Sequence, residues 1–197
     1  MKLDKHLQFW QESCDIETFM AWCHRPDSWK LDICDLVVKN NAIVENVLDV
    51  GCGTANIYDL LHSKGYRGSY IGTEITPKFI DFNIKRGVDV VHSDVRDLKF
   101  KDKSFDCVMA LDVLNHQLDF EKPLSELCRV AKKFIIVSFF KAFETPSRIN
   151  YKRENLLDHH FSKPELEEFL KSNGFEYEFF AANFKSKPDH LIIYAPN

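Results

Sequence analysis

The sequence predicts an α/β protein in which a mostly parallel β-sheet has helices on both faces. From residue 46 onward, short apolar segments alternate with amphipathic helical ones through short connections, and repeated β-α-β units of this kind require parallel strands. Residues 1–45 differ, because apolar and aromatic residues recur there every three or four positions, which is the period of a helix. The 197 residues are therefore expected to form one domain, with a helical cap over 1–45 and a core over 46–197.

The N-terminal 45 residues should form at least two helices. Pro26 interrupts the helical pattern, and Asp27 or Ser28 is a suitable N-cap for the helix that follows. For Trp10 and Trp22, packing in the core is the expected role on spacing alone.

Five strands are expected in the core. The first, "NVLDV", is a continuous apolar run, as in a strand buried on both faces. Thr76 and Pro77 have the residue types of an N-cap and a first helical position, so a helix should begin there. The expected strands are 46–50, 69–74, 88–94, 105–111 and 132–140, with helices at 55–65, from residue 77, and at 120–131.

The pattern changes after the fifth strand. An irregular insertion is expected over 141–161, followed by a helix that Ser162 and Pro164 open and Gly174 closes. The last two strands, 175–182 and 190–196, are joined by a loop too short for a crossover helix. They should therefore pair antiparallel at an edge of the sheet.

Composition narrows the function classes. The apolar content of 45% and charged content of 28% are ordinary for a soluble globular protein, and the net charge of −4 does not suit a large nucleic-acid footprint. The first residues lack a secretory apolar segment, and the longest apolar run is far too short to span a membrane. The six cysteines are scattered without a C-x-x-C pair, so we expect a cytoplasmic protein with no metal site and no disulfide.

The stretch "VLDVGCGTA", residues 47–55, ends the first strand in a glycine-rich loop. A dinucleotide site needs G-x-G-x-x-G, but Asn56 occupies the third glycine position. A phosphate-binding loop of the G-K-[ST] type is missing too. Instead an acid, Asp49, stands two positions before Gly51, and this favours a cationic ligand over a phosphate.

Four motifs occur in order and at matching spacing: "LDVGCGTA", "YIGTEITPKFI", "VVHSDVRDLKFKDKSFDCVMALDVLNH" and "ELCRVAKKFIIVSF". With these motifs the chain resembles the class I S-adenosylmethionine-dependent methyltransferases, in their small-molecule branch (type 11/25-like). The segment "HHFSKPELEEFLKSNGFEYE" agrees with the C-terminal part of that branch. The resemblance covers 46–195 well and the first 45 residues poorly. It implies a Rossmann-like three-layer sandwich with strand order 3-2-1-4-5-7-6, strand 7 antiparallel. It also implies S-adenosylmethionine as cofactor and S-adenosylhomocysteine as product.

The resemblance assigns cofactor roles by position. Glu74 would bind the ribose hydroxyls, Asp94 and Val95 would bracket the adenine, and Asp49 would meet the cationic end of the cofactor. Ala55 replaces a glycine that many members carry, a common exchange. The full set of implied cofactor-binding residues is Asp49, Gly51, Cys52, Gly53, Glu74, Ile75, Asp94, Val95 and Leu111.

Candidate catalytic and substrate residues follow from their places in the chain. A base is needed only if the nucleophile arrives protonated, and the candidates are His116, Asp112 and His160. Asp112 and His116 would share a face if a helix begins there, although a structural role for His116 fits equally well. Residues 8–28 and 141–161 should form the lid and acceptor pocket, with substrate contacts from Trp10, Trp22, Tyr151 and His159.

The sequence leaves the acceptor open. An O, N or S nucleophile of a small molecule is the main interpretation, with a monomeric or homodimeric enzyme. The alternatives are a non-catalytic cofactor-binding or protein-interaction module, and a methyltransferase that acts on a protein or RNA. The chain lacks the D/N-P-P-Y-like turn of base and glutamine methylation, and no Y-x-x-x-K supports a nicotinamide oxidoreductase.

Overall fold

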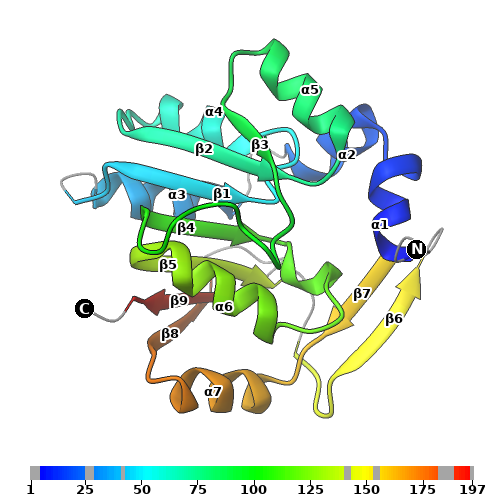
Figure 1. Ribbon diagram of the computed structural model, residues 1–197, viewed down its shortest axis with the longest axis vertical. Coiled ribbons are helices and arrows are strands. Elements are labelled where there is room, and N and C mark those ends of the chain that lie inside the picture. Colours follow the sequence, from blue (N-terminus) through cyan, green and yellow to red (C-terminus); the bar gives the residue numbers. More distant parts are fainter. Residues whose placement is uncertain are drawn as a thin grey trace.

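The computed structural model describes residues 5–24, 29–40, 43–139, 143–152, 156–181 and 189–195. Its centre is a seven-stranded sheet of order β3-β2-β1-β4-β5-β9-β8 (Figure 1). Two further strands form a separate hairpin. The strands are β1 (Asn46–Val50), β2 (Ser69–Glu74), β3 (Val90–His92), β4 (Phe105–Leu111), β5 (Ala131–Phe139), β6 (Arg148–Lys152), β7 (Leu156–His160), β8 (Glu176–Ala181) and β9 (Asp189–Tyr194).

The sheet confirms the predicted topology. Strands β1 to β5 pair in parallel, whereas β9 runs antiparallel to both β5 and β8. Because the hairpin adds two strands to the count, β8 and β9 are the sixth and seventh strands of the expected order 3-2-1-4-5-7-6.

Successive side chains of a strand point to opposite faces of the sheet, so the hydrophobic core has two parts, one on each face. On β4, Val108 and Ala110 point to the face covered by α6 (Glu121–Val130) and α7 (Lys163–Ser172). Cys107 and Met109 point to the face covered by α3 (Lys30–Lys39) and α4 (Asn56–Ser63). All four side chains are fully buried, as expected for a central parallel strand. The helices and turns are α1 (Lys5–Gln8), η1 (Phe9–Ser13), α2 (Ile16–Cys23), α3 (Lys30–Lys39), α4 (Asn56–Ser63), α5 (Pro77–Lys85), η2 (Leu114–His116), α6 (Glu121–Val130) and α7 (Lys163–Ser172).

The predicted capping residues of the helices are confirmed for α7 and only in part for α5. Ser162 caps α7 as predicted, since its hydroxyl accepts from the backbone N–H of Glu165, and Gly174 follows the helix with φ +72°. Thr76 precedes Pro77 at the start of α5 but makes no side-chain cap bond. Residues 25–28, which include the expected helix break and N-cap, lie outside the described residues.

One expectation about the fold is wrong. The insertion after β5 is not irregular, because Arg148–Lys152 and Leu156–His160 pair antiparallel as the β6–β7 hairpin. In Figure 1 this hairpin lies beside the N-terminal helix α1, and the two elements are in contact. Within the described ranges, no helix has the length and apolar character needed to cross a membrane. The cytoplasmic location stays a prediction.

Candidate functional site

A cavity of about 520 Å³ opens at the carboxyl ends of the central strands. This edge of an open α/β sheet is where ligands bind, since strand order reverses beside β1. The volume lies within the ~300–1,000 Å³ range of small-molecule sites. The described lining residues are Leu7, Trp10, Phe19, Trp22, Cys23, Lys30, Asp49, Val50, Gly51, Cys52, Asn56, Ile57, Glu74, Ile75, Phe79, Ser93, Asp94, Val95, Leu111, Asp112, Val113, His116, Gln117 and Leu156.

The glycine loop after β1 requires its small residues. Gly51 and Gly53 have φ of +69° and +54°, a region that L-residues with a Cβ rarely adopt. A Cβ on Gly51 would lie 2.6 Å from Val113 Cγ2, and one on Gly53 would lie 2.4 Å from the Phe19 ring. The space beside both glycines is thus filled by protein side chains. Ala55 also has a positive φ, +53°, which is consistent with glycine at this position in many members.

Glu74, at the end of β2, joins the glycine loop after β1 to the turn that follows β2. Its Oε2 accepts from the backbone N–H of Gly53 at 2.9 Å, and its Oε1 accepts from those of Ile75 and Thr76 at 2.8 and 2.9 Å. Burial raises the pKa of the Glu74 carboxyl, and these backbone donors oppose the rise. The result is a buried, oriented carboxylate at the cavity wall.

Asp49 is the second buried acid of the cavity. Its Oδ2 accepts from the Tyr70 hydroxyl at 2.7 Å. Burial raises the pKa of the Asp49 carboxyl to about 6, against the lowering effects of Tyr70 and Lys30. An anion this poorly solvated attracts a cationic ligand group strongly.

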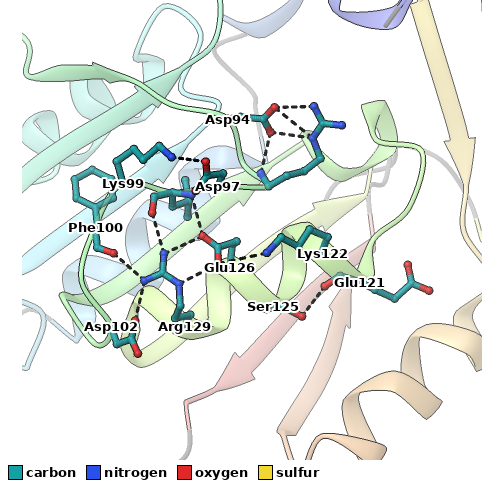
Figure 2. Close-up of polar contacts among 12 residues, drawn as sticks. Asp94, Asp97, Lys99, Phe100, Asp102, Glu121, Lys122, Ser125, Glu126 and Arg129 are labelled. Atoms are coloured by element: carbon teal, nitrogen blue, oxygen red, sulfur yellow. Dashed lines mark hydrogen bonds and ion pairs between the residues drawn. The ribbon is translucent and has the colours of Figure 1, made fainter.

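Asp94, the third acid, is held by a neighbour. Arg96 pairs with its carboxylate at 2.7 Å and also donates its backbone N–H to Asp94 Oδ1. Figure 2 shows Asp94 above a second network in which Arg129 links Glu126 to Asp102 and to the carbonyl of Phe100. The second network attaches the segment between β3 and β4 to α6, and so it anchors the loop that carries Asp94.

Asp112 follows β4 in a left-handed conformation with φ +61°. Ser138 on β5 stabilises it: the Asp112 N–H donates to Ser138 Oγ, which in turn donates to Asp112 Oδ1, both at 2.8 Å. Burial raises the pKa of the Asp112 carboxyl. The helix that would have aligned Asp112 with His116 does not begin there, since only the short turn η2 follows, yet both residues line the cavity.

His116 combines a backbone contact with an aromatic one. Its Nδ1 lies 2.7 Å from the carbonyl oxygen of Leu157 on β7. Its ring meets that of Trp10 edge-on at a centroid distance of 4.8 Å. The cap and the hairpin therefore meet at this histidine.

The N-terminal segment packs beside the glycine loop and contributes side chains to the cavity wall. Phe19 packs on Phe79 with ring centroids 4.7 Å apart, and His24 Nε2 lies 2.7 Å from the Thr54 hydroxyl in the glycine loop. Trp22 lines the cavity and is 43% exposed, so its expected place in the core is wrong. Trp10 is partly buried against a small cluster around Phe9 and Phe79.

Most predicted cofactor residues converge on the cavity. Eight of the nine line it, and the exception is Gly53, whose N–H is bound by Glu74. His116, Asp112, Trp10 and Trp22 line it as well.

Three predicted residues are not among the described lining residues. His160 pairs with Glu144 at 3.0 Å, His159 Nδ1 lies 3.0 Å from the Gln117 carbonyl oxygen, and Tyr151 is 57% exposed on β6. In the β6–β7 hairpin each of the two histidines has a polar partner and Tyr151 faces solvent.

Sequence reasoning missed several lining residues. Lys30 opens α3 in a segment without a recognised motif, and Leu156 reaches the cavity through the unpredicted hairpin. No sequence signal marks either residue. Gln117 could have been predicted together with His116, because both follow the carboxyl end of β4. Among the described residues, no group of three or more His, Cys, Asp or Glu side chains is placed to hold a metal ion.

The fold and the site together define a class. The strand order with its antiparallel β9, the glycine loop after β1 and the acid that ends β2 are those of a class I S-adenosylmethionine-dependent methyltransferase domain. Residues 48–136 match the type 11 family model described as "Methyltransferase domain". Over these residues the chain is similar to this branch of the class I methyltransferases.

Individual relatives agree with this class. The chain is 27% identical over 145 residues to sterol 4-C-methyltransferase strm-1 of Caenorhabditis elegans, covering 66% of this chain and 43% of that protein. It is 28% identical over 157 residues to demethylmenaquinone methyltransferase of Clavibacter sepedonicus, covering 76% and 62%. The chain thus spans less than two thirds of the length of either relative.

A solved structure matches almost the whole chain. Magnesium protoporphyrin IX methyltransferase from Synechocystis PCC 6803 with bound SAM superposes with a TM-score of 0.68, covering 98% of each chain at 17% identity. At this identity the match establishes the fold.

Proposed function

We propose that the chain transfers a methyl group from S-adenosylmethionine to an O, N or S nucleophile of a small molecule. The observation that carries the proposal is the cavity itself. Asp49, Glu74 and Asp94, at or next to strand ends, line it together with aromatic side chains of the N-terminal cap.

The residues present fit the cofactor. Asn56 lines the cavity, and its Oδ1 is buried without a hydrogen-bond partner among the described residues. Glu74 retains accepting capacity for a ribose hydroxyl, because a carboxylate has about four acceptor positions and the backbone uses three. Asp49 supplies negative charge for a cationic group, and Lys30 supplies a cation.

The cofactor supplies a methyl group on a sulfonium sulfur, already activated for in-line displacement. The protein's main task is then to orient the nucleophile, which is worth roughly 7–11 kcal/mol in favourable cases. Trp10, Trp22 and Leu156 would hold the acceptor by its apolar surface. His116 is the proposed base for an acceptor that arrives protonated, and Asp112, beside it on the same wall, would orient the acceptor or the cofactor.

The chemistry of the cavity favours a neutral and largely apolar acceptor. Its described lining residues include four carboxylates (Asp49, Glu74, Asp94 and Asp112) and one lysine, so a polyanionic acceptor would be repelled. Most of the other described lining residues are aromatic or aliphatic, with a few uncharged polar side chains among them. The names of the sterol and demethylmenaquinone relatives are consistent with an acceptor of this type.

We also propose that residues 8–28 and 141–161 act as lid and acceptor pocket. Phe19 and Trp22 from α2, and Leu156 from β7, support this assignment because all three line the cavity. Deleting residues 1–28 should raise the KM for the acceptor and weaken cofactor binding. Unchanged values for both would refute the lid assignment.

Calorimetry and turnover test the main proposal. S-adenosylmethionine and S-adenosylhomocysteine should bind with one site per chain, and labelled methyl groups should transfer to a member of an apolar small-molecule panel. Crystals grown with S-adenosylhomocysteine and the acceptor should place the acceptor beside Trp10 and His116.

The alternatives give different results. Binding without transfer to any small molecule, peptide or RNA would indicate a non-catalytic module, and transfer to peptide or RNA alone would indicate a macromolecular substrate. A failure to bind either form of the cofactor would remove all three interpretations.

A further inference from the structure

Three hydrogen bonds join the turn after β4 to β7 of the hairpin. Asn115 Nδ2 donates to the His159 carbonyl oxygen at 2.6 Å, and His116 Nδ1 lies 2.7 Å from the Leu157 carbonyl oxygen. In the return direction, His159 Nδ1 lies 3.0 Å from the Gln117 carbonyl oxygen. Three successive residues of the turn, 115 to 117, are thus bound to two residues of one strand, 157 and 159.

These contacts determine which nitrogen of His116 carries the proton. A carbonyl oxygen only accepts hydrogen bonds, so His116 Nδ1 must donate, and in the neutral ring Nε2 then carries the lone pair. A proton acceptor in a methyltransferase site needs that lone pair directed at the acceptor, and His116 lines the cavity.

The Asn115 contact is buried and the two histidine contacts are partly buried, so their loss is costly. The Asn115 and Leu157 side chains are fully buried and His159 is 6% exposed. Burial lowers the pKa of His159, so this ring stays neutral at physiological pH and donates through Nδ1 to Gln117. An unsatisfied buried donor or acceptor costs roughly 1–3 kcal/mol, which holds the turn and the strand in register.

We propose that strand β7 fixes His116 as its Nδ1–H tautomer, with Asn115 and His159 as the positioning residues for this catalytic base. The inference rests on the proposed function for its meaning in catalysis. Neither positioning residue lines the cavity in the part of the chain that the structure describes, so both act through His116. The hairpin then has two tasks, because Leu156 forms cavity wall and the next residue, Leu157, orients the base.

Nitrogen NMR on the full chain reads the tautomer without any acceptor. With 15N-labelled histidine, long-range proton–nitrogen spectra at pH 8 distinguish a protonated Nδ1 from a protonated Nε2, and His116→Phe assigns the signals. In the wild type, His116 should be mainly the Nδ1–H form. Asn115→Ala and His159→Leu should each shift it at least threefold toward the Nε2–H form. His159→Asn should restore the wild-type ratio, because its amide Nδ2 can take the place of ring Nδ1.

The control is Asn173→Ala, which removes a comparable 2.8 Å bond from Asn173 Nδ2 to the Phe169 carbonyl oxygen at the end of α7 and should leave the His116 signals unchanged. The proposal is overturned if wild-type His116 is the Nε2–H form. It is also overturned if Asn115→Ala and His159→Leu fold but keep the wild-type ratio. If either substitution prevents folding, the wild-type spectrum and the remaining variant still decide.

Catalysis and cofactor binding separate this inference from the proposed function. Once an acceptor turns over, Asn115→Ala should lower kcat at least tenfold and displace the pH profile while the Kd for S-adenosylhomocysteine stays within twofold. Absence of cofactor binding by the wild type would remove the proposed function but leave the tautomer result standing.

Discussion

At the scale of single residues, the site depends on buried carboxylates, which have lost hydration and can therefore bind a ligand strongly. Glu74 and Asp49 end adjacent parallel strands and are 7% and 2% exposed. Burial raises the pKa of both carboxyls, because the charged form has lost water. A cationic or hydroxyl-bearing ligand replaces the interactions that water no longer provides.

Glu74→Gln should weaken cofactor binding by about 10- to 100-fold. Charge-assisted bonds to the ribose hydroxyls are worth ~1.5–3 kcal/mol, and 1.4 kcal/mol is a factor of ten in Kd. Calorimetry with S-adenosylhomocysteine measures the change. Glu178→Gln is the matched control, because Glu178 is exposed and bonds only Tyr194 among the contacts described; equal affinity loss in both variants would refute the assignment.

Asp49→Asn should stabilise the ligand-free protein above pH 6 while it weakens cofactor binding. The pKa of Asp49 rises from 3.8 to about 6 on folding, so between these values the folded state holds a proton that the unfolded state has lost. Stability therefore falls as pH rises through this window, by up to about 3 kcal/mol for a shift of this size.

Thermal unfolding of wild type and Asp49→Asn between pH 4 and pH 8 measures this effect. The two Tm values should agree near pH 4 and separate as the pH rises to 6, by roughly 2–4 °C per kcal/mol. Curves that stay parallel over the whole range would show that Asp49 ionises normally.

The residue scale also shows what sequence could and could not supply. Asp49, Glu74, Asp94 and Leu111 were predictable because strand ends on one sheet edge converge, whatever the details of packing. Tyr151, His159 and His160 are not among the described lining residues, and their places depend on how two segments pair, which spacing along one segment does not reveal. Lys30 reaches the cavity through the placement of a whole helix.

At the scale of elements, the hairpin was missed for a physical reason. In β6, "RINYK", polar and apolar residues alternate as in a strand, but the run is only five residues long and four of them are exposed. It therefore lacks the continuous apolar character of the core strands. β7 is buried in part but contains Asp158 and His159, which resemble a polar loop. The central strands were predictable because they are buried on both faces.

Helix α2 and the glycine loop are coupled by a contact that mutation can measure. Gly53→Ala must accept φ of +54° and a Cβ 2.4 Å from the Phe19 ring. A left-handed conformation costs about 1–2 kcal/mol for an L-residue with a side chain, and the ring adds a steric term.

In the double variant Phe19→Ala with Gly53→Ala, the clash with the ring is removed, whereas the cost of the left-handed backbone at residue 53 remains. Urea unfolding of the wild type, both single variants and the double variant gives the coupling free energy. We expect about 0.5–3 kcal/mol in favour of the double variant. A coupling of zero would mean that α2 does not rest on the loop. Gly65→Ala is the control, because its φ is +90° and no atom lies within 4 Å of the added Cβ.

At the scale of the whole molecule, the two edges of the sheet differ in role. The carboxyl edge holds Asp49 and the cavity, whereas the amino edge holds Asp106 at the start of β4. Asp106 is 2% exposed, accepts from the Glu45 N–H at 2.9 Å and pairs with Lys133 at 3.0 Å. Burial alone would raise the pKa of Asp106, but Glu45 and Lys133 outweigh it and lower the pKa.

The same substitution at the two edges should therefore have opposite effects. Because the pKa of Asp106 is lowered on folding, its carboxylate stabilises the protein above the unfolded value of 3.8, and this contribution disappears as pH falls through the folded value. Asp106→Asn should lower the free energy of unfolding by about 1–3 kcal/mol at pH 7, while the Kd for S-adenosylhomocysteine stays within twofold. Asp49→Asn should do the reverse, raising stability and weakening the cofactor. Urea unfolding and calorimetry on the two variants decide the matter, since two variants that change stability in the same direction would mean that the edges are not specialised. Such a division is expected where one edge of a sheet carries buried charge for a ligand and the other carries charge already paired within the fold.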